Sequence, residues 1–191
     1  MISSRKQLNE ILSYEKRLNW DNFNDKELKY QIFLSYLKRH PQWFNFKYII
    51  ALRKAGYYYT KRKKNIIFGI LYILSCRKKN RLGRKLGIEC NEQTFEKGLV
   101  IYHSQGIVVN GLARVGANCH LHGNNCIGTD GITADCPIIG NNVVLGVGAK
   151  VLGGVRIAND ITIAAGAVVV DSFLEPGVVI GGVPARIIKR K

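Results

Sequence analysis

The stretch that decides the fold is GAKVLGGVRIANDITIAAGAVVV, residues 148–170. Its larger aliphatic residues recur every six positions, at Val151, Ile157, Ile163 and Val169. This spacing is longer than the period of about 3.6 residues that is typical of a helix, and as a multiple of two it permits the alternation of a strand. The pattern therefore indicates strand-like alternation that is reset every six residues.

The six-residue register extends far beyond this stretch. Counting backwards, its positions are Val109, Val115, Leu121, Ile127, Thr133, Ile139 and Leu145, of which only Thr133 is not a large aliphatic residue. Most positions that follow are Gly or Ala, which allow sharp turns. A fixed short period over many units predicts a solenoid, in which each unit buries its apolar face against its neighbours. The alternative, a β-rich domain with accidental spacing, does not explain so long a register.

Together with GVPARII at residues 182–188, this repeat resembles the hexapeptide-repeat acyltransferases, and among them the serine acetyltransferase-like branch. The resemblance covers residues 86–191. It implies a left-handed parallel β-helix of triangular section, a homotrimer with active sites between subunits, and acetyl-CoA as the donor. It also implies O-acetylation, in which an acceptor hydroxyl attacks the thioester carbonyl.

The region before the repeat differs in composition. The chain has a net charge of +16, and residues 1–97 hold 22 of its 29 Lys and Arg but 8 of its 13 Asp and Glu. Caps at Ser4 and Asn24 and a run of apolar residues from Asn65 to Leu74 predict helices. We therefore expect an α+β chain, with a basic α-helical domain at residues 1–85 and the β-helix at residues 86–191. Higher assembly would then use the helical domain.

The location of the protein is inferred from what the sequence lacks. It has no apolar run of about eighteen residues, so no transmembrane helix is expected. Its N-terminus lacks the apolar core of a signal peptide. The five cysteines are odd in number and irregularly spaced, which favours a reducing compartment. These features predict a cytoplasmic protein, or one at the inner face of the membrane if its basic region contacts lipid.

The basic region leaves several interpretations open. Between Arg53 and Lys85 there are twelve basic residues and no acidic one, and they flank the apolar run Ile66–Leu74. This run packs into the helical domain or a subunit interface, or it forms a peripheral contact with an anionic membrane. Nucleic acid is disfavoured as a partner, because no recognised binding motif accompanies the charge.

Acetyl transfer to a hydroxyl needs a general base, donors for the oxyanion and a groove for the donor molecule. His103 directly precedes SQGIVV, and serine acetyltransferases have their catalytic His in the matching place. The resemblance thus makes His103 the general base. The family's orienting Asp falls on Ile88, so a one-residue slip would let Glu89 orient His103. Glu89 as a surface charge is the alternative.

Positions that contact the acceptor depart from the family. The Asp before the catalytic His is replaced by Tyr102, and an Arg-His pair before a proline is replaced by Asp135 and Cys136. Asp cannot make the bidentate contact of Arg to the carboxylate of serine, but it accepts hydrogen bonds from sugar hydroxyls. We therefore expect a sugar of a surface polysaccharide or its precursor as the acceptor. The alternative acceptor is L-serine, which would place the protein in cysteine biosynthesis.

Two histidines lie close together in NCHLHGNNC. His120 and His122 would point to the same side of a strand. We expect His122 to border the acceptor pocket, with Asn124 or Asn125 as a hydrogen-bond donor there. The nearby cysteines raise the question of zinc, but their spacing matches no structural zinc motif, so no metal is expected.

The donor groove is expected in GVGAK at 146–150 and AAGAV at 164–168, which resemble the coenzyme A groove of the family. Small side chains would admit the pantetheine arm, and basic ones would hold the phosphate end. The expected donor-binding residues are Gly148, Ala149, Lys150, Ala164, Ala165, Arg186 and Lys189. The alternative to an enzyme is a non-catalytic scaffold that uses the solenoid for assembly and the basic helices for docking on a membrane.

Overall fold

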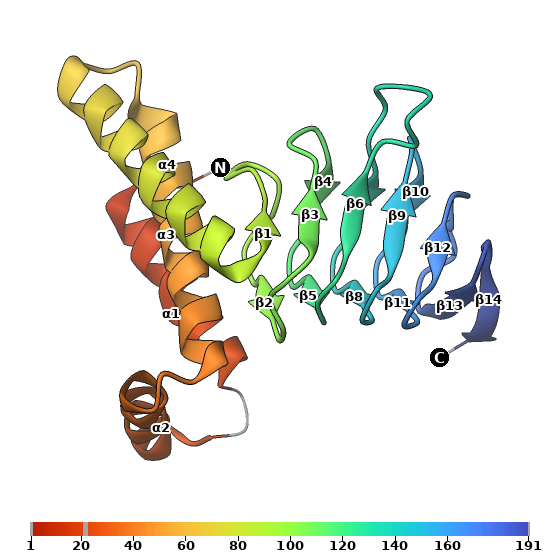
Figure 1. The fold of residues 1–191 in the computed structure, drawn as a ribbon, viewed down its shortest axis with the longest axis horizontal. Helices are drawn as coiled ribbons and strands as arrows, with labels where there is room; N and C mark the ends of the chain where they lie inside the picture. The colour runs from red at the N-terminus through yellow and green to blue at the C-terminus, as the bar shows by residue number, and fades with distance from the viewer. Residues whose placement is uncertain (1, 21–22, 191) are drawn as a thin grey trace. The chain divides into compact units, whose positions relative to one another are not determined.

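The computed structural model describes residues 2–20 and 23–190 (Figure 1). The chain divides into two compact units, Met1–Leu86 and Gly87–Lys191. The first unit is helical and the second is a β-helix. An α+β chain with helices first and a left-handed parallel β-helix second is thus confirmed.

The helical unit contains four helices. They are α1 (Arg5–Asn19), α2 (Asp25–Leu37), α3 (Pro41–Lys61) and α4 (Ile66–Leu86). Both expected caps are present, since Ser4 accepts a hydrogen bond from the backbone N–H of Gln7 and Asn24 forms a capping box with Glu27. In the described part of the chain, no helix is both long and apolar enough to cross a membrane.

Helix α4 is longer than its apolar run predicted. It continues from Leu74 through the basic segment to Leu86, because Arg, Lys and Leu favour a helix and no proline interrupts them. One face of α4 packs on α3 through aromatic pairs, Tyr58 with Phe68 and Tyr59 with Tyr72.

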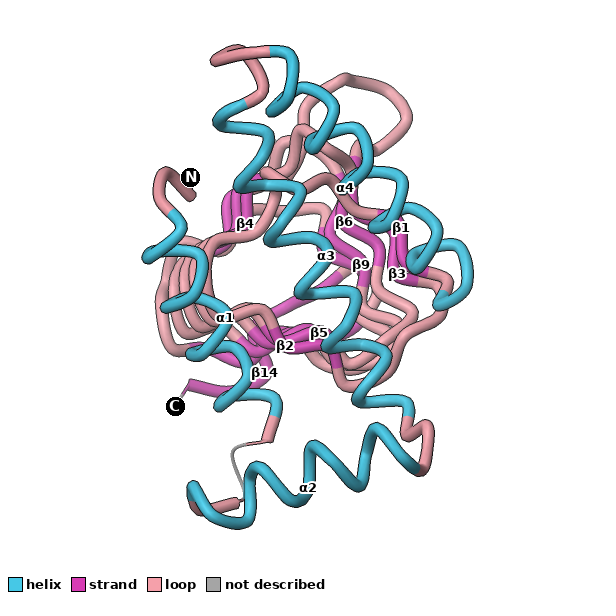
Figure 2. The backbone as a smooth tube through the Cα atoms, turned by 90° about the vertical axis from the view of Figure 1, so that its left-hand side faces the viewer, coloured by secondary structure: helices cyan, strands magenta, loops and turns pink. Residues whose placement is uncertain are grey.

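The second unit is built from three sheets that form the sides of a triangle (Figure 2). The first sheet contains β1 (Ile88–Glu89), β3 (Ile107–Val109), β6 (Cys126–Gly128), β9 (Lys150–Leu152) and β12 (Val168–Val169). The second contains β4 (Arg114–Val115), β7 (Ile138–Ile139) and β10 (Arg156–Ile157). The third contains β2 (Val100–Ile101), β5 (His120–Leu121), β8 (Val144–Leu145), β11 (Thr162–Ile163), β13 (Val178–Gly182) and β14 (Ala185–Arg190). All pairs are parallel except β13 with β14, a hairpin.

The six-residue register fills the interior of this triangle. Its ten aliphatic positions are all buried, and Ile127, Leu145, Val151, Ile163 and Val169 are fully enclosed. Such stacking explains how strands of two or three residues are stable, because each coil covers the apolar face of the next.

Thr133 breaks the register for a structural reason. Ile127 lies in the first sheet, and Ile139 pairs with Val115 in the second sheet. Residues 129–137 leave the wall as a loop, in which Thr133 is exposed. Including Thr133 in the six-residue register of the β-helix was therefore wrong, because Thr133 lies in a loop. The loop adds one full hexad, so the spacing resumes in phase at Ile139.

Candidate active site at one corner of the β-helix

The candidate site lies where the third sheet turns into the first. The buried residues Ile101, Leu121, Leu145 and Ile163 are stacked in register along the third sheet. Ile180 continues this stack beside Ile163. The residues that directly follow these five therefore form a second stack at the corner, which we call the corner column. The corner column consists of Tyr102, His122, Gly146, Ala164 and Gly181.

Backbone hydrogen bonds hold the corner column together. The N–H of Tyr102 donates to Leu121 O at 2.9 Å, and the N–H of His122 donates to Leu145 O at 3.1 Å. Gly146 and Ala164 continue the pattern with bonds of 2.8 Å. The column is thus a rigid feature of the β-helix, and its side chains change from aromatic in the first coils to Gly and Ala in the last.

The aromatic end of the column gathers three rings. The ring of Tyr102 stacks on that of His122, with centroids 4.4 Å apart and an interplanar angle of 26°. The hydroxyl of Tyr102 lies 3.4 Å from Nδ1 of His120. Both histidines therefore face the same side of the strand, as their spacing predicted. Tyr102 in turn limits how either imidazole can rotate.

His103 follows Tyr102 in the turn between β2 and β3, and it is exposed. It lies against the next coil at Gly123, where an added Cβ would come within 3.0 Å of both Cβ and O of His103. Gly123 also has a φ of +105°, a conformation that disfavours other residues. This glycine therefore allows the two imidazole-bearing coils to approach.

Burial lowers the pKa of His122, and the nearby charge of His103 lowers it further. The physical cause is that a second positive charge is unfavourable beside the first and in a partly desolvated site. His122 is accordingly neutral at neutral pH, so that it can accept or donate a hydrogen bond there.

Glu89 lies in β1 with an exposed side chain, opposite Val108 in β3. Within the described residues, neither a hydrogen bond nor an ion pair joins Glu89 to His103. Its assignment as the residue that orients His103 stays a prediction.

Asn125 was the alternative to Asn124 as a hydrogen-bond donor in the acceptor pocket, and the structure gives it other partners. It is fully buried, and its Oδ1 accepts a hydrogen bond from the N–H of Gly123 at 2.9 Å. Its Nδ2 donates to Gly146 O at 2.8 Å and to Ala149 O at 3.4 Å. Asn125 thus ties the histidine-bearing coil to the coil below. In the sequence, Asn125 is an amide at a repeat position where the next coil has Ala149.

Its neighbour Asn124 is exposed at the same turn and has a φ of +54°. Its backbone N–H donates to Gln105 O, which fixes the turn beside His103. The side chain is therefore free of the interior, as an acceptor-contacting residue requires.

The residues expected to bind acetyl-CoA lie mostly in the later coils at this corner. Ala164 and Ala165 lie in the last coils, and an added Cβ on Gly146 would come within 2.6 Å of Ala165 N. Gly148 donates its N–H to Gly123 O at 2.9 Å. The side chain of Ala149 is fully buried, so Ala149 cannot contact a ligand through its methyl group.

The three basic residues expected at the phosphate end have different surroundings. Lys150 is exposed, and its Nζ donates to Gly148 O at 3.2 Å. Arg186 pairs with Asp171 at 2.9 Å in an exposed ion pair. Lys189 is exposed on β14. Lys150 and Lys189 are therefore better placed than Arg186 to offer an uncompensated charge.

Asp135 and Cys136 lie at a different corner, in the loop 129–137 between the first and second sheets. Asp135 packs beside Gly154 of the next coil. The structure therefore does not bring these two residues into the corner column of their own coil.

The chemistry of this loop is that of a hydrogen-bonding surface. Asp130 accepts hydrogen bonds from the N–H groups of Ile132 and Thr133, which lower the pKa of its carboxyl. Burial and the neighbouring Asp135 raise the pKa of the Cys136 thiol, which disfavours a thiolate nucleophile. Among the described residues, no group of three His, Cys, Asp or Glu is arranged to hold a metal ion.

About half of the chain is similar in sequence to proteins named serine acetyltransferase. The one from Synechococcus elongatus is 36% identical over 96 residues, which are 49% of this chain and 39% of that protein. The one from Mycobacterium tuberculosis is 37% identical over 90 residues, 46% of this chain and 39% of that protein. The chain thus matches about two fifths of the length of these relatives. No protein-family model matches it.

Solved structures share the fold of both units. A serine acetyltransferase from Brucella abortus in complex with coenzyme A has a TM-score of 0.77 at 23% identity, over 98% of this chain and 70% of that one. A serine acetyltransferase from Neisseria gonorrhoeae in complex with serine has a TM-score of 0.75 at 24% identity, over 97% and 71%. These comparisons confirm the resemblance to the serine acetyltransferase-like, hexapeptide-repeat acyltransferases.

Proposed function

We propose that this chain is an acetyl-CoA-dependent O-acetyltransferase with His103 as its general base. The observation that carries the proposal is the corner column, in which Tyr102 and His122 stand at one end of a strip of Gly and Ala, with His103 directly after Tyr102. The sequence similarity to serine acetyltransferases over about half of the chain supports it. A neighbour of the same fold in complex with coenzyme A supports the choice of donor.

The small residues of the corner column suit the long arm of the donor. At Gly146 and Ala164 no large side chain covers the main chain, so the amides of the pantetheine arm can pair with backbone groups. Lys150 and Lys189 supply positive charge for the phosphates. The acetyl group would then lie towards His122 and His103.

In the reaction, His103 accepts the proton of the acceptor hydroxyl while the oxygen attacks the thioester carbonyl. Main-chain N–H groups stabilise the oxyanion. The carbon–sulfur bond then breaks, and the imidazolium returns its proton to the sulfur, which gives an acetyl ester and the free thiol of CoA. A neutral His122 places no second cation beside the imidazolium that forms on His103.

The names of the relatives favour L-serine as the acceptor over the sugar that the sequence analysis ranked first. One observation keeps a carbohydrate acceptor as the second candidate. Asp135 and Cys136 stand where the family has the Arg-His pair, and Asp135 is exposed. A carboxylate there repels that of serine, whereas it accepts hydrogen bonds from sugar hydroxyls.

The proposal includes a homotrimer with active sites between its subunits. Asp135 and Cys136 lie at another corner than His103, so a neighbouring copy is the source from which they would reach a shared acceptor site. The β-helix also has exposed aliphatic side chains that a contact between copies would cover, among them Leu112 and Ile138.

The test is release of the CoA thiol from acetyl-CoA with L-serine and with a panel of nucleotide sugars and oligosaccharides. We expect turnover with one acceptor class, and His103→Ala should lower kcat by roughly 10²–10⁴-fold. The matched control is His40→Asn, because His40 caps α3 and Asn also caps helices. Folded protein that releases no thiol with any acceptor and does not bind CoA would contradict the proposal and favour a scaffold.

A further inference from the structure

The outward face of α4 has no covering element in the helical unit. The isoleucines and leucines that it exposes are Ile66, Ile67, Ile70, Ile73 and Leu74, each at least half exposed. At 100° per residue all five fall within one arc of the helix. The opposite face carries Phe68 and Tyr72, which pack on tyrosines of α3. These five aliphatic side chains therefore do not pack into their own domain, although the first interpretation of the sequence allowed packing there or in a subunit interface.

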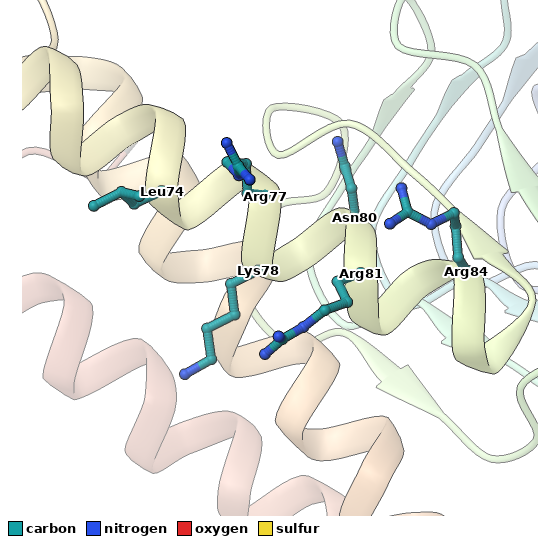
Figure 3. A pocket seen from close by; sticks show the side chains of 6 residues that line it. All are labelled: Leu74, Arg77, Lys78, Asn80, Arg81 and Arg84. Atoms are coloured by element: carbon teal, nitrogen blue, oxygen red, sulfur yellow. The ribbon is translucent and has the colours of Figure 1, made fainter.

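The same face continues into a row of cations. Arg77, Arg81 and Arg84 lie further along α4 on the same side of the helix as the aliphatic residues, and all three are exposed. Together with Leu74, Lys78 and Asn80 they line a hollow of about 570 Å³ on α4. Figure 3 shows how these side chains follow one another along the helix.

Acidic residues are missing from this whole region. The sequence contains no Asp or Glu between Glu27 and Glu89. The aliphatic half of the face is also preceded by the basic segment 61–64. Any partner of the face must therefore bring negative charge and accept aliphatic side chains at the same time.

We propose that the outward face of α4 docks on an anionic lipid surface. The aliphatic residues from Ile66 to Leu74 would enter the boundary between headgroups and acyl chains, with the helix lying in the plane of the surface. The arginines would contact lipid phosphates, for which their planar donor groups are suited. The span Ile66–Leu74 is too short to cross a bilayer, so the contact is peripheral.

Charge complementarity favours lipid over a second copy of this chain. A symmetric contact through this face would set the arginines of one copy against the arginines or the aliphatic side chains of the other, with no carboxylate of α4 to pair with them. Nucleic acid would use the cations but not the five aliphatic side chains. The lipid surface is the partner that uses both halves of the face.

The experiment is flotation of the full chain with vesicles of phosphatidylcholine alone and with added phosphatidylglycerol. We expect binding to the anionic vesicles only, and weaker binding at high salt. The combined change Arg77→Gln, Arg81→Gln and Arg84→Gln should reduce partitioning by about 100-fold, since each cation contributes roughly five-fold. The matched control is Arg5→Gln, Lys6→Gln and Lys29→Gln, which removes equal charge from exposed positions outside α4.

A second variant tests the aliphatic half. Ile66→Ser with Ile70→Ser should also lower binding to anionic vesicles, while the thermal unfolding and the mass in solution stay unchanged. Three results would overturn the proposal: no binding to anionic vesicles, equal losses in the two charge variants, or a change of oligomeric mass in the α4 variants, which would assign the face to a contact between copies. CoA binding is measured in parallel and should not change, so failure here leaves the acetyltransferase proposal intact.

Discussion

The large aliphatic residues of the six-residue register are buried in the β-helix, whereas several large aliphatic residues are exposed in the helical unit. In the β-helix, Ile157 and Ile163 are at most 3% exposed, whereas in α4 Ile66 and Ile73 are more than half exposed. Composition does not separate these cases, because both segments are rich in Ile and Leu. The spacing of the residues separates them. In the β-helix, the strict six-residue spacing points the large side chains of the register inward. In α4, a continuous apolar run around the helix has more apolar surface than one neighbouring helix can cover.

Ion pairs show the opposite distribution between the two units. The helical unit buries an ion pair, in which Nη2 of Arg53 lies 2.5 Å from Oε1 of Glu15, with the side chains 4% and 0% exposed. The β-helix keeps its pair of Arg190 and Glu175 at the surface, at 2.7 Å. Loss of one partner leaves an uncompensated buried charge in the first case and a hydrated charge in the second.

The largest expected effect breaks the buried pair. Glu15→Ala should lower the free energy of unfolding by about 3–5 kcal/mol, because Arg53 would remain charged and enclosed. The control Glu175→Ala should cost less than about 1 kcal/mol. Denaturant unfolding followed by circular dichroism measures both. Equal costs would contradict the contrast between the two units.

A smaller effect separates the two classes of isoleucine. Ile163→Ala should destabilise the β-helix by about 2–5 kcal/mol, since it leaves a cavity inside the triangle. Ile70→Ala should change stability by no more than about 0.5 kcal/mol, because this side chain is half exposed. Thermal unfolding of both variants checks the difference. A large loss from Ile70→Ala would mean that another element covers α4 in solution.

The variant Asn125→Ala tests the role of the corner that holds the candidate site. This change leaves Gly123 N–H and Gly146 O without their buried partner, which should cost about 1–3 kcal/mol. Because Asn125 positions the turn beside His103, kcat should fall more than KM rises. The control Asn142→Ala removes an exposed corner amide instead. Equal effects of the two variants on kcat would remove Asn125 from the site.

The smallest effect is a pH dependence from His122. Its pKa in the folded protein lies below the ordinary value of 6.5. The unfolded chain therefore binds the proton more tightly, so this contribution to stability is present above about pH 6.5 and is lost as the pH falls towards the folded pKa. His122→Gln should flatten this part of the profile of melting temperature against pH. An unchanged profile would mean that His122 is not desolvated.

Much of the fold could be predicted from the hexads, because stacked coils repeat one local rule. His103 was singled out by the resemblance to serine acetyltransferases, which have their catalytic His in the matching place, and its role stays a prediction. The loop 129–137 could not be placed, since a full extra hexad leaves the periodicity in phase on both sides. Asn125 was considered as a donor to the acceptor, but its hydrogen bonds to the backbone were not predicted, because such bonds have no sequence pattern of their own.

The helical unit was less predictable for a different reason. Apolar and basic side chains in α4 are compatible with packing, assembly or lipid, and only their exposure in the fold separates these outcomes. The acceptor residues share this difficulty. Asp135 and Cys136 are close to the repeat in sequence, yet they belong to another corner of the triangle than His103.

The most direct test of the central claim is CoA binding by calorimetry to a matched pair of variants. Ala164→Trp fills the corner column, whereas Ala158→Trp adds the same bulk at the equivalent position after Ile157, on the corner between the second and third sheets. Both alanines are partly exposed and donate their N–H to the next coil at 2.8 Å. The account predicts that Ala164→Trp abolishes binding and Ala158→Trp preserves it. Wild-type affinity in the Ala164→Trp variant, with the fold intact, would contradict it.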